Sequence, residues 1–342
     1  MNKPLPMLPL VFASLSSAAI LTLATLSGCE TNAATGRSQY SALSPEQEVQ
    51  LGKEAAPQII QEHGGSLADP ALNSFVTAIG AKMAATTEGS NPQLPWNFTI
   101  LNSDILNAFA LPGGEVFISR GLMQRMTNEA QLAGVIGHEI GHVTARHTND
   151  RIWKSTLVGG IASIGSSILT EGVGPDLGQI APQVVQMGGE TVVLRFSRED
   201  ELEADKLGMR YMANVGYNPT GQRQVMQILE AAAGEPNQSE WFSTHPYPKT
   251  RIEQIDQLLS TTYASQHKSE DGYFEDRFKA NVLKRLTALP PAAHPFHASD
   301  YRTTLVASPR ERSLFAPPQL WCAHCRDNST FNAMSVRAFA PY

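Results

Sequence analysis

The chain has 342 residues, of which 42% are hydrophobic and 17% are charged, and its formal net charge is -6 at pH 7. This is the composition of a globular protein that is long enough for one large domain or two smaller ones. The mild negative charge, without a basic run that follows a phosphate backbone, argues against nucleic acid as a partner.

The N-terminus has the pattern of an export signal. Lys3 precedes an apolar stretch at residues 8–26, which is nearly long enough to cross a bilayer, so a retained anchor helix is the alternative interpretation. The sequence Leu-Ser-Gly-Cys that ends at Cys29 resembles the lipoprotein box of bacteria, in which the cysteine is acylated. Residues 1–28 are therefore predicted to be a lipoprotein signal peptide, and Cys29 to be the lipidated residue that anchors the protein to a membrane.

Two helices are expected next in the chain. The polar segment 29–43 is expected to be a tether. Ser44 is a candidate N-cap, with Pro45 at the first helical position of a helix through Ile60. Apolar residues recur on one helical face at 70–84, which predicts a second helix there.

Three short strands are expected after these helices, at residues 96–101, 106–111 and 115–119. Asn102-Ser-Asp can form the first turn between them, and Pro112-Gly-Gly fits a type II turn. The pattern predicts a small antiparallel meander.

The stretch GVIGHEIGHVTARH, residues 134–147, carries the chemistry. On a helix, His138 and His142 lie on the same face, about 5–6 Å apart at Cβ, and can bind the same zinc ion. Glu139 is turned about 100° from His138, where it flanks the metal and can act as general base toward the attacking water. For this motif alone, a helix whose histidines are packed or solvated is the alternative.

This helix is expected to begin near Thr127 or Asn128, either of which can cap it. Gly134, Gly137 and Gly141 each cost about 0.5–1 kcal/mol relative to alanine in a helix interior. We infer that another backbone approaches the helix closely: the sheet on one side, and the helix with the third ligand on the other.

A third ligand must come from elsewhere, because His147 lies five residues after His142 and projects to a different face. The acids of residues 196–208 are the candidates. Glu201 shares a helical face with small residues, as packing against the histidine helix requires, and is the expected metal ligand. Asp205, one turn later, can accept a hydrogen bond from a ligand histidine and fix its tautomer, unless it is an ordinary surface acid. A solvated charged stripe is expected to contain Glu199, Glu203, Lys206 and Arg210.

Three ordered motifs now resemble a known family: NAFALPGG at 107–114, HEIGH at 138–142 and SRxxExEAD at 197–205. Together they resemble the zinc metallopeptidases typified by CAAX prenyl protease and HtpX, peptidase family M48, and most closely their periplasmic lipoprotein branch. The resemblance runs from about residue 45 to 259. It implies a mainly helical, gluzincin-type α+β domain with a small antiparallel sheet beside the HExxH helix. It further implies one Zn2+ per chain, bound by His138, His142 and Glu201, with Glu139 as the catalytic base.

Two further site predictions remain open. An exposed strand at Asn107, Ala108, Phe109 and Ala110 can pair with an extended substrate peptide, or it is a buried structural strand. In periplasmic relatives, a loop similar to residues 243–248 can bring a histidine over the metal. His245 is therefore a possible fourth zinc ligand that holds an inactive state, or it is a loop histidine that packs or contacts substrate.

The remaining segments complete the predicted domain plan. Residues 44–262 form the metallopeptidase domain, 263–288 a helical extension and 289–342 a poorly ordered tail. Within the domain, helical patterns are expected at 183–214, 219–233 and 249–259. Residues 155–170 are too short and rich in Gly and Ser for a membrane span, and favour a packed hairpin or substrate-facing loop. Cys322 and Cys325 are expected to form a local disulfide or to be idle thiols.

The leading hypothesis is a zinc-dependent endopeptidase that hydrolyses misfolded or misassembled periplasmic and outer-membrane proteins. It is expected at the periplasmic face of a bacterial envelope, anchored through Cys29; Glu30 is no clear inner-membrane retention signal, which favours the outer membrane. The alternative is a lipoprotein chaperone or assembly factor with a largely silent zinc site. An integral-membrane prenyl-protein processing enzyme is disfavoured, because the sequence lacks several apolar spans of about 20 residues.

Overall fold

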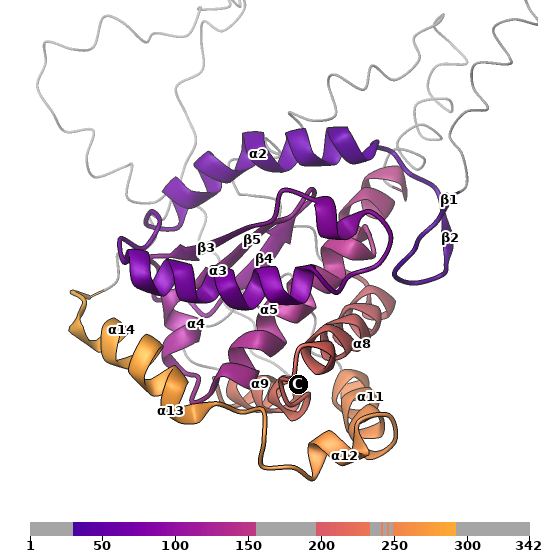
Figure 1. Cartoon of the computed structure of the whole chain (residues 1–342). Coiled ribbons are helices and arrows are strands. Elements are labelled where there is room, and N and C mark those ends of the chain that lie inside the picture. The colour runs from indigo at the N-terminus through magenta and orange to yellow at the C-terminus, as the bar shows by residue number, and fades with distance from the viewer. Residues whose placement is uncertain (1–29, 155–195, 233–240, 242–244, 246–248, 292–342) are drawn as a thin grey trace, which may run out of the picture. The chain divides into compact units, whose positions relative to one another are not determined.

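The structure, a computed structural model, describes residues 30–154, 196–232, 241, 245 and 249–291 (Figure 1). Several sequence predictions lie outside these residues: the signal peptide, the lipidated Cys29, the segment 155–170, the residues 183–195 and the tail with Cys322 and Cys325. Among the described helices, none combines the length and the apolar character that crossing a membrane requires.

The two N-terminal helices form where the sequence predicts them. Helix α2 spans Pro45–Glu62, and Ser44 caps it in a capping box with Gln47, so that two backbone N–H groups at its start are satisfied. Helix α3 spans Pro70–Ala84, and the Asp69 carboxylate accepts hydrogen bonds from the first-turn N–H groups. Proline at the first helical position fits both starts, since that position needs no hydrogen-bond donor.

The sheet contains β3 (Asn97–Leu101), β4 (Ala108–Leu111) and β5 (Glu115–Ser119) in the order β3-β5-β4. Strands β4 and β5 form the expected antiparallel hairpin, whereas β3 pairs with β5 in parallel. The prediction of an antiparallel meander is therefore wrong for β3, which does not form a hairpin with β4. Residues 102–104 make no hairpin turn, because α4 (Arg120–Gln124) holds them: Gly121 N–H donates to Ser103 O, and Arg120 donates to the Asn102 side chain.

Alternation along the strands places the sheet between two apolar layers. Leu101, Phe109 and Phe117 pack with α2 on one face. Ile100, Val116 and Ile118 belong to the large core on the other face, which contains α3 and α5. Strand β4 lies at one edge of the sheet and contacts α5 (Figure 1).

Helix α5 (Glu129–Thr144) carries the HExxH motif and is buried along its whole length. Asn128 caps it, which is one of the two predicted caps, by accepting a hydrogen bond from Gln131 N. It contacts the sheet and several further helices, among them α3, α8 (Arg198–Asn214) and α9 (Thr220–Ala232). Helix α11 (Lys249–Ser260) packs against α8 and α9 in turn. The helix that carries the chemistry is thus the centre of the fold.

The glycines of α5 permit this close packing. A Cβ atom on Gly141 would lie 2.8 Å from Ala204 O, and one on Gly208 would lie 2.8 Å from His138 N. Gly134 faces Gln222 of α9 at similar range. The inference that another backbone approaches these glycines is confirmed for α8, the helix with the third ligand. The expectation that the sheet approaches them on the other side is wrong, because the element against Gly134 is α9.

Shorter elements complete the described chain. Residues expected to be a tether contain a hairpin of β1 (Glu30–Thr31) and β2 (Ser38–Gln39), and the Asn32 side chain bonds Thr144 O at the end of α5. A short turn, η1, spans Asn91–Gln93, and α12 spans Ala264–His267. The elements α13 (Glu275–Phe278), the π-helical turn η3 (Lys279–Leu283) and α14 (Lys284–Ala288) follow one another, and they pack into the large core through Phe278, Val282 and Leu286.

Candidate metal centre

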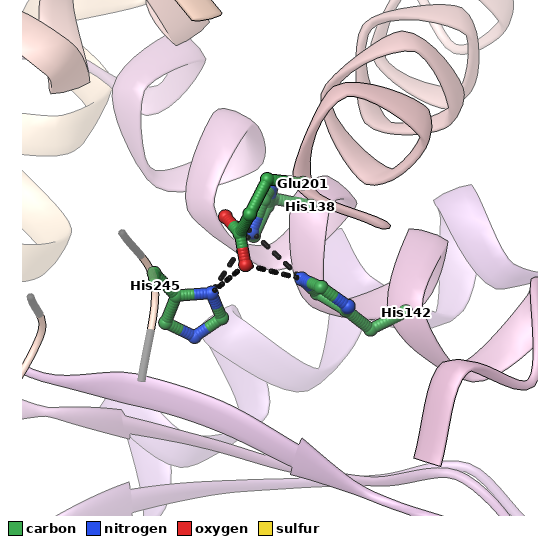
Figure 2. A group of neighbouring side chains, drawn as sticks. All are labelled: His138, His142, Glu201 and His245. Atoms are coloured by element: carbon green, nitrogen blue, oxygen red, sulfur yellow. Dashed lines mark hydrogen bonds and ion pairs between the residues drawn. The ribbon is translucent and has the colours of Figure 1, made fainter. Parts of the chain in front are cut away.

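Four buried side chains from separate parts of the chain point toward one another (Figure 2). His138 and His142 come from α5, Glu201 comes from the first turn of α8, and His245 lies ahead of α11. One ligand atom from each lies within 4.8 Å of the others. The structure therefore brings the predicted carboxylate to the predicted histidine pair.

The hydrogen bond at one nitrogen of a histidine ring determines whether the other nitrogen can offer a lone pair to the centre. His138 Nδ1 lies 2.9 Å from the Asp205 carboxylate, which only accepts hydrogen bonds, so His138 Nδ1 carries a hydrogen. The Nε2 atoms of His138 and His142 lie 3.0 Å apart, and Glu201 lies 3.4 and 3.5 Å from them. Converging imidazole nitrogens and a carboxylate in a dry site form the donor set that zinc takes in peptidases.

The protonation states of the ligands suit a cation. Burial lowers the pKa of His142 well below its usual value, which keeps the imidazole neutral. Burial alone would raise the pKa of Glu201, but the charges of His245 and Arg251 lower it well below its usual value. A neutral imidazole and an ionised carboxylate are the metal-binding forms of these groups.

His138 shows the same preference for positive charge. Burial lowers its pKa, but the hydrogen bond and charge of Asp205 and those of Glu201 raise it to about 9. The two carboxylates thus stabilise a cation at this ring. A metal ion bound at Nε2 would benefit from the same charges, because it would lie beside Glu201.

Glu139 is buried beside the centre, and neither carboxylate oxygen has a hydrogen-bond partner among the described residues. The His245 ring lies next to it, with Nε2 3.7 Å from Glu139 Oε1. Burial is the largest effect on the Glu139 carboxyl and raises its pKa. A carboxyl group in this position is able both to accept and to return a proton.

Asp205 is fully buried and makes several contacts around His138. Besides His138, it binds the Gln222 side chain at 2.8 Å and the Arg251 guanidinium at 2.7 Å through two nitrogens. Burial alone would raise the pKa of Asp205, but Arg251 and His138 lower it far below its usual range. Asp205 therefore remains an anion that orients the His138 ring.

Arg251 of α11 is a functional candidate that our sequence analysis missed. Its side chain is 1% exposed, and Nη1 lies 2.7 Å from Glu201 Oε2 while its other two nitrogens bind Asp205. A signal exists in the sequence, since Arg251, Ile255 and Leu259 recur every four residues on the buried face of α11. A lone arginine on a buried, apolar helix face indicates buried carboxylates nearby, because a buried charge needs a partner of opposite sign.

His147 is not one of the four clustered ligand residues, as expected, but it does not project away from His142 as the sequence analysis supposed. Helix α5 ends at Thr144, and Arg146 adopts the left-handed conformation with φ 57°, so the chain reverses before a new helical stretch at 147–154. This brings His147 Nδ1 to 2.9 Å from His142 Nδ1. The face calculation failed because it assumed one continuous helix.

Aromatic rings surround the ligand histidines. Phe196 stacks on His142, with ring centroids 3.9 Å apart. Trp241 stacks on His245 at 4.5 Å, and Trp241 O accepts a hydrogen bond from His245 N–H. These rings exclude water from the centre and hold the imidazoles in place.

The predicted substrate strand is the edge strand β4 and its leading residue. The strand is not exposed as expected, because Ala108 and Phe109 are buried and Ala110 is half-buried. The Asn107 side-chain amide is also buried and has no partner among the described residues. A small hollow lies beside the end of this strand. It is lined by Ala110, Leu111, Pro112, His142, Val143, Arg146, Thr148, Asn149 and Glu48.

A buried helix with two histidines and an adjacent glutamate, joined by a carboxylate from a second helix, defines a centre of the metallopeptidase class. The chain belongs to peptidase family M48, whose model matches residues 70–259. The resemblance inferred from the three sequence motifs, and with it the helical α+β fold class, is confirmed.

Relatives with assigned names agree with this membership. The chain is 29% identical over 220 residues to the beta-barrel assembly-enhancing protease of Escherichia coli K12, covering 64% of this chain and 45% of that protein. It is 27% identical over 241 residues to the mitochondrial metalloendopeptidase OMA1 of Schizosaccharomyces pombe, covering 69% and 68%. OMA1 of Arabidopsis thaliana is 35% identical over 158 residues, covering 46% and 30%. The chain thus spans less than half the length of the E. coli relative.

Proposed function

We propose that the chain is a zinc-dependent endopeptidase with His138, His142 and Glu201 as metal ligands and Glu139 as catalytic base. The observation that carries the proposal is the convergence of the three ligand side chains next to a buried carboxylate that has no hydrogen-bond partner in the described part of the chain. A purely structural metal site would need no such carboxylate.

The geometry gives the metal and Glu139 separate roles in the reaction. When bound, zinc supplies positive charge that polarises the scissile carbonyl and lowers the pKa of the attacking water to about 7. The Glu139 carboxylate accepts a proton from that water while the water oxygen bonds to the carbonyl carbon. When the carbon–nitrogen bond breaks, Glu139 returns the proton to the leaving nitrogen. The raised pKa of Glu139 suits both steps, because a pKa closer to neutral pH allows the group both to accept and to donate a proton.

Strand β4 supplies an alignment surface for the substrate in this proposal. As an edge strand beside α5, it offers main-chain groups to an extended peptide, as β-augmentation requires. The amide of Asn107 at its start, which has no hydrogen-bond partner within the residues that the structure describes, is a further hydrogen-bonding group for such a peptide. Pairing through the main chain favours a broad range of unfolded substrates.

His245 is proposed as a fourth ligand that holds a resting state. Its Nδ1 lies 2.9 Å from Glu201 Oε1 and 3.3 Å from His138 Nε2, so it stands among the other ligands. A fourth protein ligand takes the position that a catalytic site keeps open. We expect His245→Ala to increase hydrolysis of an unfolded protein substrate; unchanged hydrolysis together with an unchanged spectrum of the cobalt-substituted protein would remove this role.

The biological substrates are proposed to be misfolded or misassembled envelope proteins. The support is the name of the E. coli relative, a beta-barrel assembly-enhancing protease, and the export and lipidation pattern of this sequence. Attachment to the periplasmic side of the outer membrane through Cys29 belongs to the same proposal.

Metal content and turnover together test the proposed activity. Purified wild-type protein is expected to bind one zinc ion per chain and to cleave an unfolded protein, and Glu201→Ala is expected to lose both properties. Glu139→Gln is expected to keep zinc and lose cleavage. Substrate degradation by Glu139→Gln equal to wild type would overturn the catalytic assignment, and an envelope phenotype that survives it would favour the chaperone role.

A further inference from the structure

The ligand histidine His142 has an unusual outer partner. His138 is supported by a carboxylate, but His142 Nδ1 meets the ring of His147, which is itself fully buried. His147 Nε2 in turn lies 3.1 Å from Glu203 Oε2. Two imidazoles in series therefore connect the centre to a carboxylate of α8.

The order of donors and acceptors along this chain is determined from its outer end. Glu203 only accepts hydrogen bonds, so His147 must present N–H at Nε2 to it. With its hydrogen on Nε2, the His147 ring offers a lone pair at Nδ1, which accepts from the N–H at His142 Nδ1. The lone pair of His142 is thereby left on Nε2, which is the atom that faces Glu201 and His138.

The N-terminal hairpin fixes the outer end of the chain. Arg37, next to β2, places Nη2 2.8 Å from the same Glu203 oxygen that accepts from His147. Glu203 is 23% exposed and Arg37 42% exposed, so the chain of contacts runs from the buried centre to the surface. Asn32 of the same hairpin bonds Thr144 O, where α5 ends.

We propose that His147 is a positioning residue that holds the ligand His142 in its Nδ1–H tautomer, with Glu203 and Arg37 orienting His147. The inference rests on the proposed metal-binding function and adds a requirement that the HExxH motif does not contain. Outer partners of ligand histidines raise metal affinity by roughly 10- to 100-fold, because they fix ring orientation and tautomer before the metal binds.

Zinc affinity of the full chain, measured by competition with a chromogenic chelator, tests the proposal without using turnover. His147→Phe keeps a ring of similar size but removes the acceptor, and we expect zinc to bind roughly 10- to 100-fold more weakly. His147→Gln offers an amide oxygen to His142 Nδ1 and is expected to recover part of the affinity. Glu203→Ala changes a partly exposed residue and is expected to weaken zinc binding in the same direction.

A buried control separates positioning from general stability. Tyr211→Phe removes a buried hydroxyl that bonds Thr144 and Glu88, between the same two helices. We expect it to lower thermal stability while zinc affinity stays at the wild-type value. Nitrogen-15 NMR of the chelated protein gives a second readout: His142 is Nδ1–H in wild type, and this tautomer loses population in His147→Phe and in Glu203→Ala.

The outcomes distinguish this inference from the proposed function. Wild-type zinc affinity in both His147→Phe and Glu203→Ala, with Glu201→Ala unable to bind zinc, would overturn the positioning role alone. If His147→Phe does not fold, an unchanged affinity and an unchanged His142 tautomer in Glu203→Ala overturn it. A wild-type protein that binds no zinc would overturn both proposals.

Discussion

Arg251 is expected to stabilise the metal centre before any metal binds. Its guanidinium contacts Asp205 through Nε and Nη2 and Glu201 through Nη1, each at 2.7 Å, in a fully buried site. Arg251→Met keeps most of the side-chain volume but leaves both carboxylates without their main cationic partner. We therefore expect the chelated protein to lose much of its stability.

The expected loss of stability follows from the cost of leaving a buried charge without its partner. Removing one member of a buried ion pair costs about 3–5 kcal/mol, because the remaining charge stays desolvated. In a domain of 150–250 residues, each kcal/mol shifts the melting temperature by about 2–4 °C, so the expected decrease is about 6–20 °C. Arg251→Lys is expected to lie between wild type and methionine, since an ammonium group does not reproduce the planar fork.

Urea unfolding with and without zinc measures this effect. The loss is expected to be smaller with zinc, because the metal neutralises Glu201 and leaves only Asp205 without its partner. Arg223→Met is the matched control: Arg223 is 24% exposed and pairs with the exposed Asp256 at 2.8 Å, a surface pair worth about 0–1 kcal/mol. If Arg251→Met loses no more stability than Arg223→Met, the reasoning about buried charge is refuted.

Three further predictions concern packing, catalysis and pH. Gly208→Ala is expected to destabilise the protein by about 1–3 kcal/mol, because its Cβ would lie 2.8 Å from the backbone of α5. The control, Lys206→Ala on the exposed face of α8, should change the free energy of unfolding by less than about 0.5 kcal/mol. Equal losses of stability in urea unfolding would contradict the close-packing argument. Glu139→Gln is expected to reduce peptide hydrolysis by about 10²–10⁴-fold, and an unchanged rate in a fluorogenic peptide assay would show that another group is the base. Because the pKa of Asp205 is lowered in the folded state, its contribution to the free energy of unfolding is fully present above the unfolded-state pKa of about 3.9 and is lost as pH falls toward the folded-state value. Asp205→Asn should therefore flatten the acid side of the stability–pH curve of the chelated protein. A curve as steep as that of wild type would count against this assignment.

Local signals were sufficient for most of the helices. Ser44 and Asn128 are caps in the structure because a short polar side chain at these positions satisfies N–H groups that the helix itself leaves free. The helix at 70–84 was predicted from its apolar face alone, and the structure has it at the same residues. These features depend on neighbours within about two turns, which the sequence displays directly.

Long-range pairing was less accessible to sequence reasoning. Nothing near residues 102–104 shows that α4 will capture them, so a turn was the simplest interpretation and the strand pairing came out wrong. Glu201 was found because small residues on its helical face indicated close packing. Arg251 and His147 were missed, since the first depends on contacts with α8 and the second on a left-handed arginine that ends a helix without a glycine.

The cation centre explains why the surrounding fold tolerates features that are unfavourable by themselves. Three glycines in α5 each cost about 0.5–1 kcal/mol, and the left-handed Arg146 costs about 1–3 kcal/mol. Gly137 and Gly141 allow the close approach of α8 with Glu201, Gly134 allows that of α9, and Arg146 folds His147 back onto His142. A cation that binds only the folded state stabilises it by RT ln(1 + [L]/Kd), about 4.1 kcal/mol at 1,000 times Kd. That amount is comparable to the local costs, so metal binding and the stability of this helix pair are expected to be strongly coupled.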